Sequence, residues 1–565
     1  MHGSTTKELL ETLCEQQIIT RDQCRIVEAD TLQTQLSVST LLCEYGFVDD
    51  TVLRENSDDT QKVRIVSLED SLIDADALQL IDAATARRLQ VLPVYYDKAT
   101  NQLEVAINDP TDVRVHDALD DLLRDRVKLT YCQAPLAEIE SAIARAYGFE
   151  QSIEAVIDEL THQGTTADNN PVNPENTLDD DQGHPVVRLT NGLIMQAYRA
   201  GASDIHFEPE ARFFRVRFRI DGLLVTWRML HIDHWPACAT RLKVIGGLNI
   251  AESRSTQDGA FGLRIGSSSV DLRISVFPTL HGENIVLRLL DPANACKQLD
   301  HIGFDGHTRQ QLLQVIKQPQ GLVLLVGPTG CGKTTTLYAL LNHLADDSIN
   351  IMTLEDPVEY RLSGIRQSSV QSGKLDFAAG VRGILRQDPD IILIGEIRDR
   401  ETAELALRAS MTGHLVFATL HTRSALGAYQ RLTDLGVERG VLLESVIGVI
   451  SQRLLRTFCS FCTAHESDIS SIHQSSAPCS RCRGSGYSGR SAIAEVLHPG
   501  AVLNGIFDRE GWLETGRLRR ELSKTGFRSL SEAARQLVDC GKTSMTEVRR
   551  VLGEECTLNW KETVG

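Results

Sequence analysis

The chain has 565 residues, of which 42% are hydrophobic and 24% charged, and a formal net charge of −18. This length predicts roughly three or four domains of about 150 residues each. The acidity argues against a nucleic-acid-binding protein, which usually carries a basic surface. No apolar run approaches the roughly 20 residues that span a membrane, and the N-terminus lacks the apolar core of a signal peptide. We therefore expect a cytoplasmic protein, in which the 13 cysteines are thiols or metal ligands rather than disulfides.

The N-terminal third contains three regions of different pattern. Residues 1–60 carry leucine and isoleucine at helical spacing and predict a helical module with a weak internal repeat. Residues 61–149 combine strand patterns at 91–96 and 103–107 with a closing helix, which predicts a small α/β domain. Residues 150–184 are polar, acidic and proline-bearing, and predict a flexible linker.

Residues 185–292 predict an α/β domain with an antiparallel sheet. The segment 213–220 alternates apolar and basic residues before Asp221-Gly222, a dipeptide that favours a hairpin. Arginines alternate with apolar residues along several expected strands, which indicates either a solvated sheet face or an anion-facing surface. These arginines are Arg215, Arg217, Arg219, Arg273 and Arg288.

Residues 300–450 predict a P-loop nucleotide-binding domain, because residues 327–334 fit the pattern G-x-x-x-x-G-K-[ST] at every fixed position. A buried-strand pattern at 322–326 precedes the loop and a helical pattern follows it. The glycines allow the backbone to wrap phosphate, Lys333 is expected to reach the β- and γ-phosphates, and the Thr334 hydroxyl is expected to bind Mg²⁺. The residues expected to contact the nucleotide are Gly327, Pro328, Thr329, Gly330, Cys331, Gly332, Lys333, Thr334 and Thr335.

Three more apolar strand patterns of this domain end in Glu355, Glu396 and His421. In an open parallel sheet, ligands bind where the strands end. We expect Glu355 to orient the attacking water and Glu396 to belong to the metal shell, although the two roles can be exchanged. His421 is expected to sense or relay the γ-phosphate; the alternative is a structural histidine. Arg382 and Arg386 are four residues apart, which predicts that they share one helix face. They are candidates for an arginine finger or a domain contact, and the alternative is surface charge.

Four cysteines follow the spacing C-x₂-C-x₁₆-C-x₂-C, which is typical of a four-thiolate zinc site. A closed shell of four ligands predicts a structural metal; two redox dithiols are the alternative. The four residues are Cys459, Cys462, Cys479 and Cys482. Residues 451–490 are therefore expected to form a zinc-binding subdomain, and residues 491–565 to run through C-terminal helices.

Together, and in this order, the motifs resemble those of the secretion ATPases that drive type II secretion and type IV pilus assembly. The resemblance covers 185–500 strongly and 61–149 more weakly. Its motifs lie at 202–209, 220–222, 257–259, 327–334, 354–359, 386–399 and 412–422, followed by the four cysteines.

The resemblance implies a multidomain α/β protein. Its RecA-like P-loop ATPase core is preceded by an α/β (PAS-like) domain and a small N-terminal region, and carries a zinc-knuckle insertion and a helical C-terminus. It implies a cytoplasmic homohexamer that hydrolyses ATP with Mg²⁺, holds Zn²⁺, and drives an inner-membrane platform protein with an adaptor. Such a protein is peripheral to the inner membrane through its partners, has no membrane span of its own and binds no nucleic acid.

The resemblance also assigns individual residues. Arg273 and Arg288 match the arginines that reach the nucleotide from the preceding domain. The family's aspartate box matches Glu355, Asp356 and Glu359, and its histidine box matches His414 and His421. One departure is Arg423, which stands where the family commonly has asparagine and puts an inter-subunit contact of that asparagine in doubt.

Two alternative functions stay open on the residues alone. A pilus-retraction ATPase shares the core motifs but usually lacks the long N-terminal region and the cysteine group. A nucleic-acid translocase or helicase uses the same fold, but the acidity and the absence of basic, aromatic stretches count against it. Length and the two-part N-terminus lean slightly toward pilus assembly over secretion.

Overall fold

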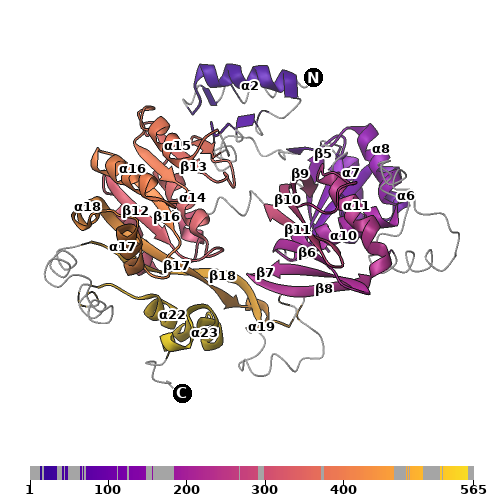
Figure 1. The fold of residues 1–565 in the computed structure, drawn as a ribbon. Coiled ribbons are helices and arrows are strands. Elements are labelled where there is room, and N and C mark those ends of the chain that lie inside the picture. Colours follow the sequence, from indigo (N-terminus) through magenta and orange to yellow (C-terminus); the bar gives the residue numbers. More distant parts are fainter. Residues whose placement is uncertain are drawn as a thin grey trace. The chain divides into compact units, whose positions relative to one another are not determined.

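The structure is a computed structural model, and the chain folds into two compact units, Met1–Ala293 and Asn294–Gly565, which we describe separately (Figure 1). Among residues 150–184, expected as a linker, only Val156 and His184 are described. The described residues are 10, 13–14, 18–34, 38, 41–42, 45–48, 64–66, 68, 71–98, 100–110, 112–123, 126–147, 156, 184–265, 268–290, 298–370, 374–463, 479, 482, 484–499, 522, 524 and 526–557.

The first unit begins with a small helical cluster around α2 (Arg21–Thr34). Val27 of this helix is fully buried and packs in one apolar cluster with Leu13 and Leu42. The leucines that recur at helical spacing are therefore buried together in this cluster.

Residues 64–147 form a small α/β domain with a four-stranded sheet in the order β1-β5-β4-β3. The β3–β4 pair is antiparallel, and the other two pairs are parallel. Helix α6 starts where the Asp82 carboxylate accepts a hydrogen bond from the Thr85 amide, as expected for an N-cap. The elements are β1 (Arg64–Ile65), α5 (Ala75–Leu78), α6 (Ala83–Leu89), β3 (Val91–Asp97), β4 (Gln102–Ile107), α7 (Val113–Leu123), β5 (Lys128–Gln133) and α8 (Leu136–Ala146).

The second sheet of this unit has seven strands in the order β2-β9-β10-β11-β6-β7-β8. In β7, Phe214, Val216 and Phe218 are buried, and the intervening arginines point to the other face. Asp221 and Gly222 both have positive φ, as a two-residue hairpin turn requires, which confirms the expected hairpin. The elements are β2 (Ser71–Leu72), α10 (Pro185–Arg199), β6 (Ala202–Pro209), β7 (Phe213–Ile220), β8 (Leu223–His231), α11 (Trp235–Ile245), β9 (Gln257–Ile265), β10 (Ser268–Thr279) and β11 (Gly282–Leu290).

Two contacts join the small α/β domain to the second sheet. Strand β2 pairs in parallel with β9, so a strand from the first domain forms the edge of the next sheet. Arg199 of α10 forms ion pairs with Asp74 and Asp76, and the Asp74 side chain is fully buried. Breaking such a buried pair is costly, so the described parts of the two domains are held together.

The second unit is built on a seven-stranded sheet in the order β14-β13-β15-β16-β12-β17-β18. All neighbouring strands are parallel except β18, which is antiparallel to β17. The elements are α13 (Gly306–Ile316), β12 (Gly321–Val326), α14 (Lys333–Leu344), β13 (Ile351–Glu355), β14 (Arg366–Ser369), α15 (Phe377–Ile384), β15 (Ile391–Ile394), α16 (Arg400–Met411), β16 (Leu415–Leu420), α17 (Ala425–Asp434), α18 (Arg439–Ser445), β17 (Val446–Phe458), α19 (Ser460–Thr463) and β18 (Tyr487–Leu497).

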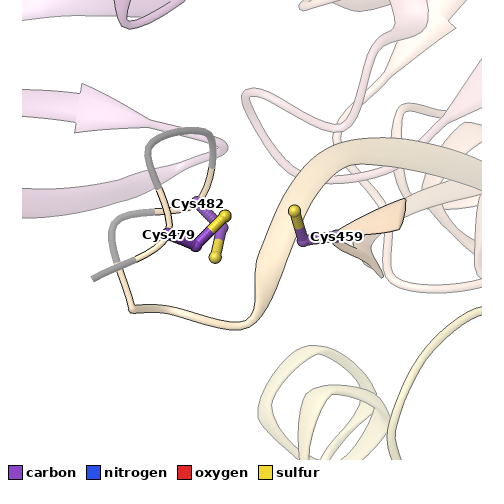
Figure 2. A group of neighbouring side chains, drawn as sticks. All are labelled: Cys459, Cys479 and Cys482. Atoms are coloured by element: carbon purple, nitrogen blue, oxygen red, sulfur yellow. The ribbon is translucent and has the colours of Figure 1, made fainter. Parts of the chain in front are cut away.

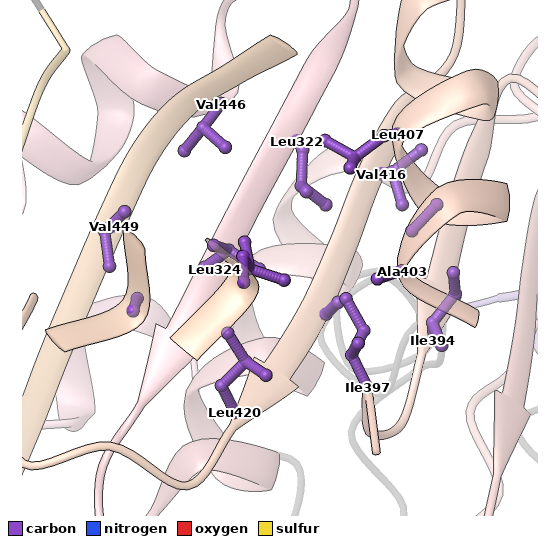
Figure 3. Close-up of a cluster of buried hydrophobic side chains, with 14 of the residues drawn as sticks. Leu322, Leu324, Ile394, Ile397, Ala403, Leu407, Val416, Leu420, Val446 and Val449 are labelled. Carbon is purple, nitrogen blue, oxygen red and sulfur yellow. The ribbon is translucent and has the colours of Figure 1, made fainter. Parts of the chain in front are cut away.

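Strand β12 is buried on both faces, which explains its continuous apolar sequence. Leu322 and Leu324 pack into the cluster on one face, together with Val416 and Leu407 (Figure 3). The alternate residues Val323 and Leu325 belong to the cluster on the opposite face. Helices on both faces thus fix the strand that leads into the P-loop.

The expectation of helices from residue 491 onward is wrong for 491–497. These residues continue β18, which pairs with β17 and closes the edge of the sheet. The apolar run 491–497 fits either a buried strand or a buried helix, and pairing with β17 decides between them. Helices α22 (Leu530–Asp539) and α23 (Met545–Leu552) follow.

The C-terminal helices attach to β17 through a buried carboxylate. Glu547 of α23 accepts hydrogen bonds from Arg456 Nη2 at 2.8 Å and Arg550 Nη2 at 2.7 Å. Its side chain is fully buried. Burial alone would raise the pKa of Glu547, but the hydrogen bonds from Arg550 and Arg456 outweigh it and lower the pKa to about 2. Among the described residues, no helix is long and apolar enough to cross a bilayer.

Candidate active site

The P-loop has the local geometry that its sequence predicts. It connects the end of β12 to α14, whose first residue is Lys333. Gly327, Gly330 and Gly332 all have positive φ, a region in which side chains are strained. The loop can therefore turn its amide groups toward a bound anion at the start of the helix.

Lys333 and Thr334 are the first two residues of α14, directly after the loop. Lys333 Nζ donates to Gly327 O at 2.8 Å and to Pro328 O at 3.2 Å, so its ammonium group lies over the loop. Burial lowers the pKa of Lys333, and the nearby Glu396 carboxylate opposes that shift. The Thr334 side chain at the first turn is exposed and can offer its hydroxyl to a metal ion.

Glu396 and His421 come together at the ends of two neighbouring strands. Glu396 follows β15 and His421 follows β16, and these strands pair in parallel. His421 Nε2 lies 3.4 Å from Glu396 Oε1, and Arg398 Nε donates to Glu396 Oε2 at 2.7 Å. Arg398 also forms an ion pair with Asp356 at 3.2 Å, so one guanidinium contacts both carboxylates, Glu396 and Asp356. The hydrogen bond to Glu396 is the main cause that raises the pKa of Arg398.

Glu355 lies at the end of β13, but its side chain has different partners. Tyr338 OH donates to Glu355 Oε2 at 2.5 Å, and Thr353 Oγ1 donates to Oε1 at 2.6 Å. Gln367 Nε2 adds a third hydrogen bond at 3.3 Å. The residue is only 5% exposed. Within the described chain, no hydrogen bond or ion pair joins Glu355 to Glu396 or His421, although Gly395 N donates to Leu354 O beside it.

The two histidines of the histidine box occupy opposite ends of β16. His414 precedes this six-residue strand and His421 follows it. At about 3.3 Å per residue, roughly 20 Å separates them. His414 Nδ1 lies 2.8 Å from Ala409 O at the end of α16. We conclude that His414 has a structural contact there, away from the P-loop end of the sheet.

Arg382 and Arg386 do not share a helix face, which corrects that expectation. Arg382 lies in the last turn of α15 and forms an ion pair with Glu401. Helix α15 ends at Ile384, so Arg386 lies beyond it.

The arginines of the first unit are largely paired with carboxylates. Arg215 and Arg217 both contact Glu208, while Arg219 and Arg288 contact Asp204. Arg288 Nε lies 3.0 Å from Asp204 Oδ1, yet 58% of the Arg288 side chain stays exposed. The β7 arginines thus belong to a neutralised sheet face, whereas Arg288 also presents its guanidinium to solvent.

Three of the four cysteines form a candidate metal site. Their sulfur atoms lie within 4.8 Å of one another: Cys459 follows β17, and Cys479 and Cys482 lie on the neighbouring segment (Figure 2). Tetrahedral coordination with Zn–S bonds of about 2.3 Å needs sulfur separations of ~3.8 Å, which these thiols can reach. The Cys462 side chain lies outside the described residues.

Several residues at the site were missed by the sequence analysis. Tyr338 and Gln367 hold Glu355, Arg398 bridges Glu396 and Asp356, and Gln452 donates to Cys331 O in the P-loop. Of these, only Arg398 lies inside a motif, directly after Glu396-Ile397. Its position two residues beyond the acidic strand end was the signal that could have identified it.

A P-loop between a parallel strand and a helix, with acidic residues and a histidine at neighbouring strand ends, defines a P-loop ATPase. Residues 179–550 match the model of the Type II/IV secretion system protein family, and residues 62–153 match the MshEN domain. The chain belongs to the Type II/IV secretion system protein family. It is an ATP hydrolase, as expected.

The relatives carry names from both secretion and pilus assembly. A putative type II secretion system protein E of Escherichia coli is 40% identical over 429 residues, which cover 74% of this chain and 86% of that protein. Type II secretion system protein HxcR of Pseudomonas aeruginosa is 41% identical over 425 residues, covering 73% and 88%. The type IV pilus assembly ATPase PilB of Myxococcus xanthus is 34% identical over 568 residues, covering 95% and 97%.

Proposed function

We propose that this ATPase powers the assembly of a type IV pilus or of a type II secretion pseudopilus. It acts as a homohexamer on the cytoplasmic side of the inner membrane, through a platform protein and an adaptor. The observation that carries this proposal is the family membership. The pilus branch is favoured because the similarity to the PilB relative extends over 95% of the chain, including the N-terminal region.

The P-loop end of the sheet binds the nucleotide in this proposal. Lys333 neutralises charge on the β- and γ-phosphates, and amides at the start of α14 point at the same anion. Thr334 and Glu396 would hold Mg²⁺, which would supply further positive charge to the phosphoryl group. His421 contacts Glu396, so a change at the γ-phosphate alters the position of the histidine.

Glu355 orients the attacking water in this proposal. Its carboxylate already accepts three hydrogen bonds, from Tyr338, Thr353 and Gln367, which fix the orientation of the group. A carboxylate has about four acceptor sites, so one remains for a water molecule. Arg273 and Arg288 supply positive charge to the transferring phosphoryl group when the arginine-bearing domain approaches the nucleotide.

The cysteine group holds a structural Zn²⁺ in this proposal, with Cys462 as the fourth ligand. Four thiolates close the coordination shell and leave no position for substrate. The metal therefore stabilises the segment between β17 and β18 and takes no part in hydrolysis.

Stimulation of the ATPase tests the proposed function. The purified chain is assayed with phospholipid vesicles plus the cytoplasmic domain of a candidate platform protein, and separately with DNA. We expect several-fold stimulation by the first addition and none by the second. Strong stimulation by DNA alone would contradict the proposal. Native mass measurements with a non-hydrolysable ATP analogue test the hexamer, since a stable monomer under all nucleotide conditions would exclude it.

A further inference from the structure

Gln452 of β17 lies directly beneath the P-loop. The last residue pair between β12 and β17 is Val326–Ser451, so Gln452 is the next residue along β17, where the loop begins. Its side-chain Nε2 donates to Cys331 O at 2.9 Å, and its Oε1 accepts from Thr336 Oγ1 at 2.8 Å. Gln452 is 1% exposed, so water cannot replace either hydrogen bond. One buried amide thus joins the P-loop to the first turn of α14.

The geometry of a trans peptide gives this contact a consequence for phosphate binding. The C=O of one residue and the N–H of the next point in opposite directions across a trans peptide bond. Gln452 holds the Cys331 carbonyl toward β17, and the Gly332 amide therefore points to the opposite side. That side of the loop, at the start of α14, is where the amides must face to bind an anion.

Arg453 forms a second contact between β17 and the loops around it. Its Nη1 donates to Gln452 O at 2.7 Å, and its Nη2 donates to Arg423 O at 2.6 Å. Arg423 is two residues beyond His421 in the chain. The guanidinium therefore joins the strand beneath the P-loop to the segment that carries the histidine. Burial lowers the pKa of Arg453.

Two glycines allow the P-loop to lie this close to β17. A Cβ on Gly332 would lie 2.9 Å from Gln452 Nε2. A Cβ on Gly327 would lie 2.8 Å from Gln452 O and 3.0 Å from Arg453 Nη1. Both positions also have positive φ. The loop therefore needs glycine at these positions for contact with β17 as well as for its backbone conformation.

We propose that Gln452 is a positioning residue that holds the P-loop in its phosphate-binding conformation, and that Arg453 is a positioning residue that links the strand beneath the loop to the His421 segment. We call this pair the β17 clamp. The proposal rests on ATP binding at the P-loop, and assigns to the clamp the orientation of the loop rather than contact with the nucleotide.

The variant Gln452→Met tests the first half, because methionine has a similar length and no hydrogen-bonding amide. We expect the affinity for MgADP, measured with a fluorescent analogue, to fall about tenfold, since a buried carbonyl loses its donor. Ser451→Ala is the matched control: Ser451 is fully buried on the same strand, and among the described residues its hydroxyl has no hydrogen-bond partner. Affinity within about twofold of wild type in a folded Gln452→Met would overturn the proposal.

Thr336→Val tests the same bridge from the other side and preserves shape. It frees Gln452 Oε1, so we expect a smaller loss of MgADP affinity in the same direction. In the double variant the loss should equal that of Gln452→Met alone, because the two residues act through one bridge. If the loss of MgADP affinity in the double variant equals the sum of the two single losses, the two residues act independently and the proposed bridge is wrong. If Gln452→Met fails to fold, Thr336→Val alone decides the test. Unchanged MgADP affinity in Thr336→Val would then overturn the proposal.

Arg453→Gln tests the link to His421. We expect kcat to fall about tenfold or more, with KM for ATP changed less than threefold, because the loop keeps Gln452 but loses its connection to Arg423. If kcat and KM change by the same factor, or if neither changes, the proposed link between Arg453 and the His421 segment is wrong. Wild-type protein that fails to bind or hydrolyse ATP would instead contradict the proposed function, so the two failures are distinguishable.

Discussion

Arg273 and Arg288 stand directly opposite each other in the antiparallel pair of β10 and β11. Directly opposed residues project to the same face, and like charges in this position destabilise a sheet. Asp204 of the neighbouring β6 compensates part of this cost through its ion pair with Arg288. Two adjacent arginines repel each other, so their placement is typical of a surface that binds a polyanion.

We expect Arg288→Ala to lower kcat for ATP at least about 10²-fold and to change the affinity for MgADP little, as for an arginine that acts on the transferring phosphoryl group. Steady-state phosphate release and equilibrium nucleotide binding measure the two effects. Arg212→Ala is the control, because Arg212 is exposed in the turn between β6 and β7. Normal hydrolysis by Arg288→Ala would remove this residue from the proposed mechanism.

Lys333→Ala is expected to abolish both nucleotide binding and turnover, because Lys333 is the cation that reaches the β- and γ-phosphates. Binding of a fluorescent ATP analogue and phosphate release measure this loss. Lys317→Ala removes an exposed lysine of the same unit and should leave both unchanged. Retained ATP binding in Lys333→Ala would mean that the loop backbone is sufficient for binding.

The two glutamates can be distinguished by isosteric substitution. Glu355→Gln should retain ATP binding and lose hydrolysis by about 10²-fold or more, since the water-positioning carboxylate is gone. Glu396→Gln should instead raise the Mg²⁺ concentration needed for half-maximal activity. Magnesium titrations of the ATPase rate separate the cases. If only Glu396→Gln abolishes hydrolysis, the two roles are exchanged.

The parts of the site that the sequence predicts are those with local patterns. Residues 322–334 encode strand, loop and helix start contiguously, and the structure places them accordingly. Glu396 and His421 could be placed because the ends of neighbouring parallel strands meet at one edge. Their contact at 3.4 Å follows from the strand order, in which β15 pairs with β16.

Tertiary contacts account for what the sequence analysis missed. Gln452 contacts the P-loop from more than a hundred residues away in the sequence. Its only signal is the polar run Ser451-Gln452-Arg453 inside an otherwise apolar part of the strand. Glu355 fits a water-orienting role by position, but nothing local shows that Tyr338 and Gln367 occupy its oxygens. The sequence predicts helix for 491–497, where the structure has a strand, because the period of a short apolar run is ambiguous.

Glu547→Gln is expected to reduce the free energy of unfolding of the C-terminal helices by about 3 kcal/mol near neutral pH, because two arginines lose a buried partner. The pKa of Glu547 falls from the usual 4.5 to about 2 on folding. Its stabilisation is therefore present above pH 4.5 and lost as the pH falls toward 2.

Urea unfolding of wild type and Glu547→Gln across this pH range measures the effect as a difference. The difference between the two proteins should be largest above pH 4.5 and shrink on acidification. Glu444→Gln, at an exposed position, should match wild type throughout. A difference that does not change with pH would contradict the ionised state of Glu547 as its cause.

Removal of zinc is expected to lower the melting temperature and to increase proteolysis within 455–490, since metal binding and folding are coupled. The purified chain should contain about one zinc ion, and Cys482→Ser should lose it. Cys540→Ser, at an exposed cysteine outside the group, should retain it. An unchanged melting curve after complete removal of the metal would contradict a structural site.

The pairing of β2 with β9 has a mechanical consequence. A load applied to the small α/β domain enters the next sheet as shear along backbone hydrogen bonds, in register at Ser71–Arg264 and Leu72–Ile265. The Arg199–Asp74 ion pair resists the same displacement. From β9 the load passes to β10, the strand of Arg273. Tension on the small α/β domain is thus delivered to the strand that carries Arg273, a residue proposed to act on ATP.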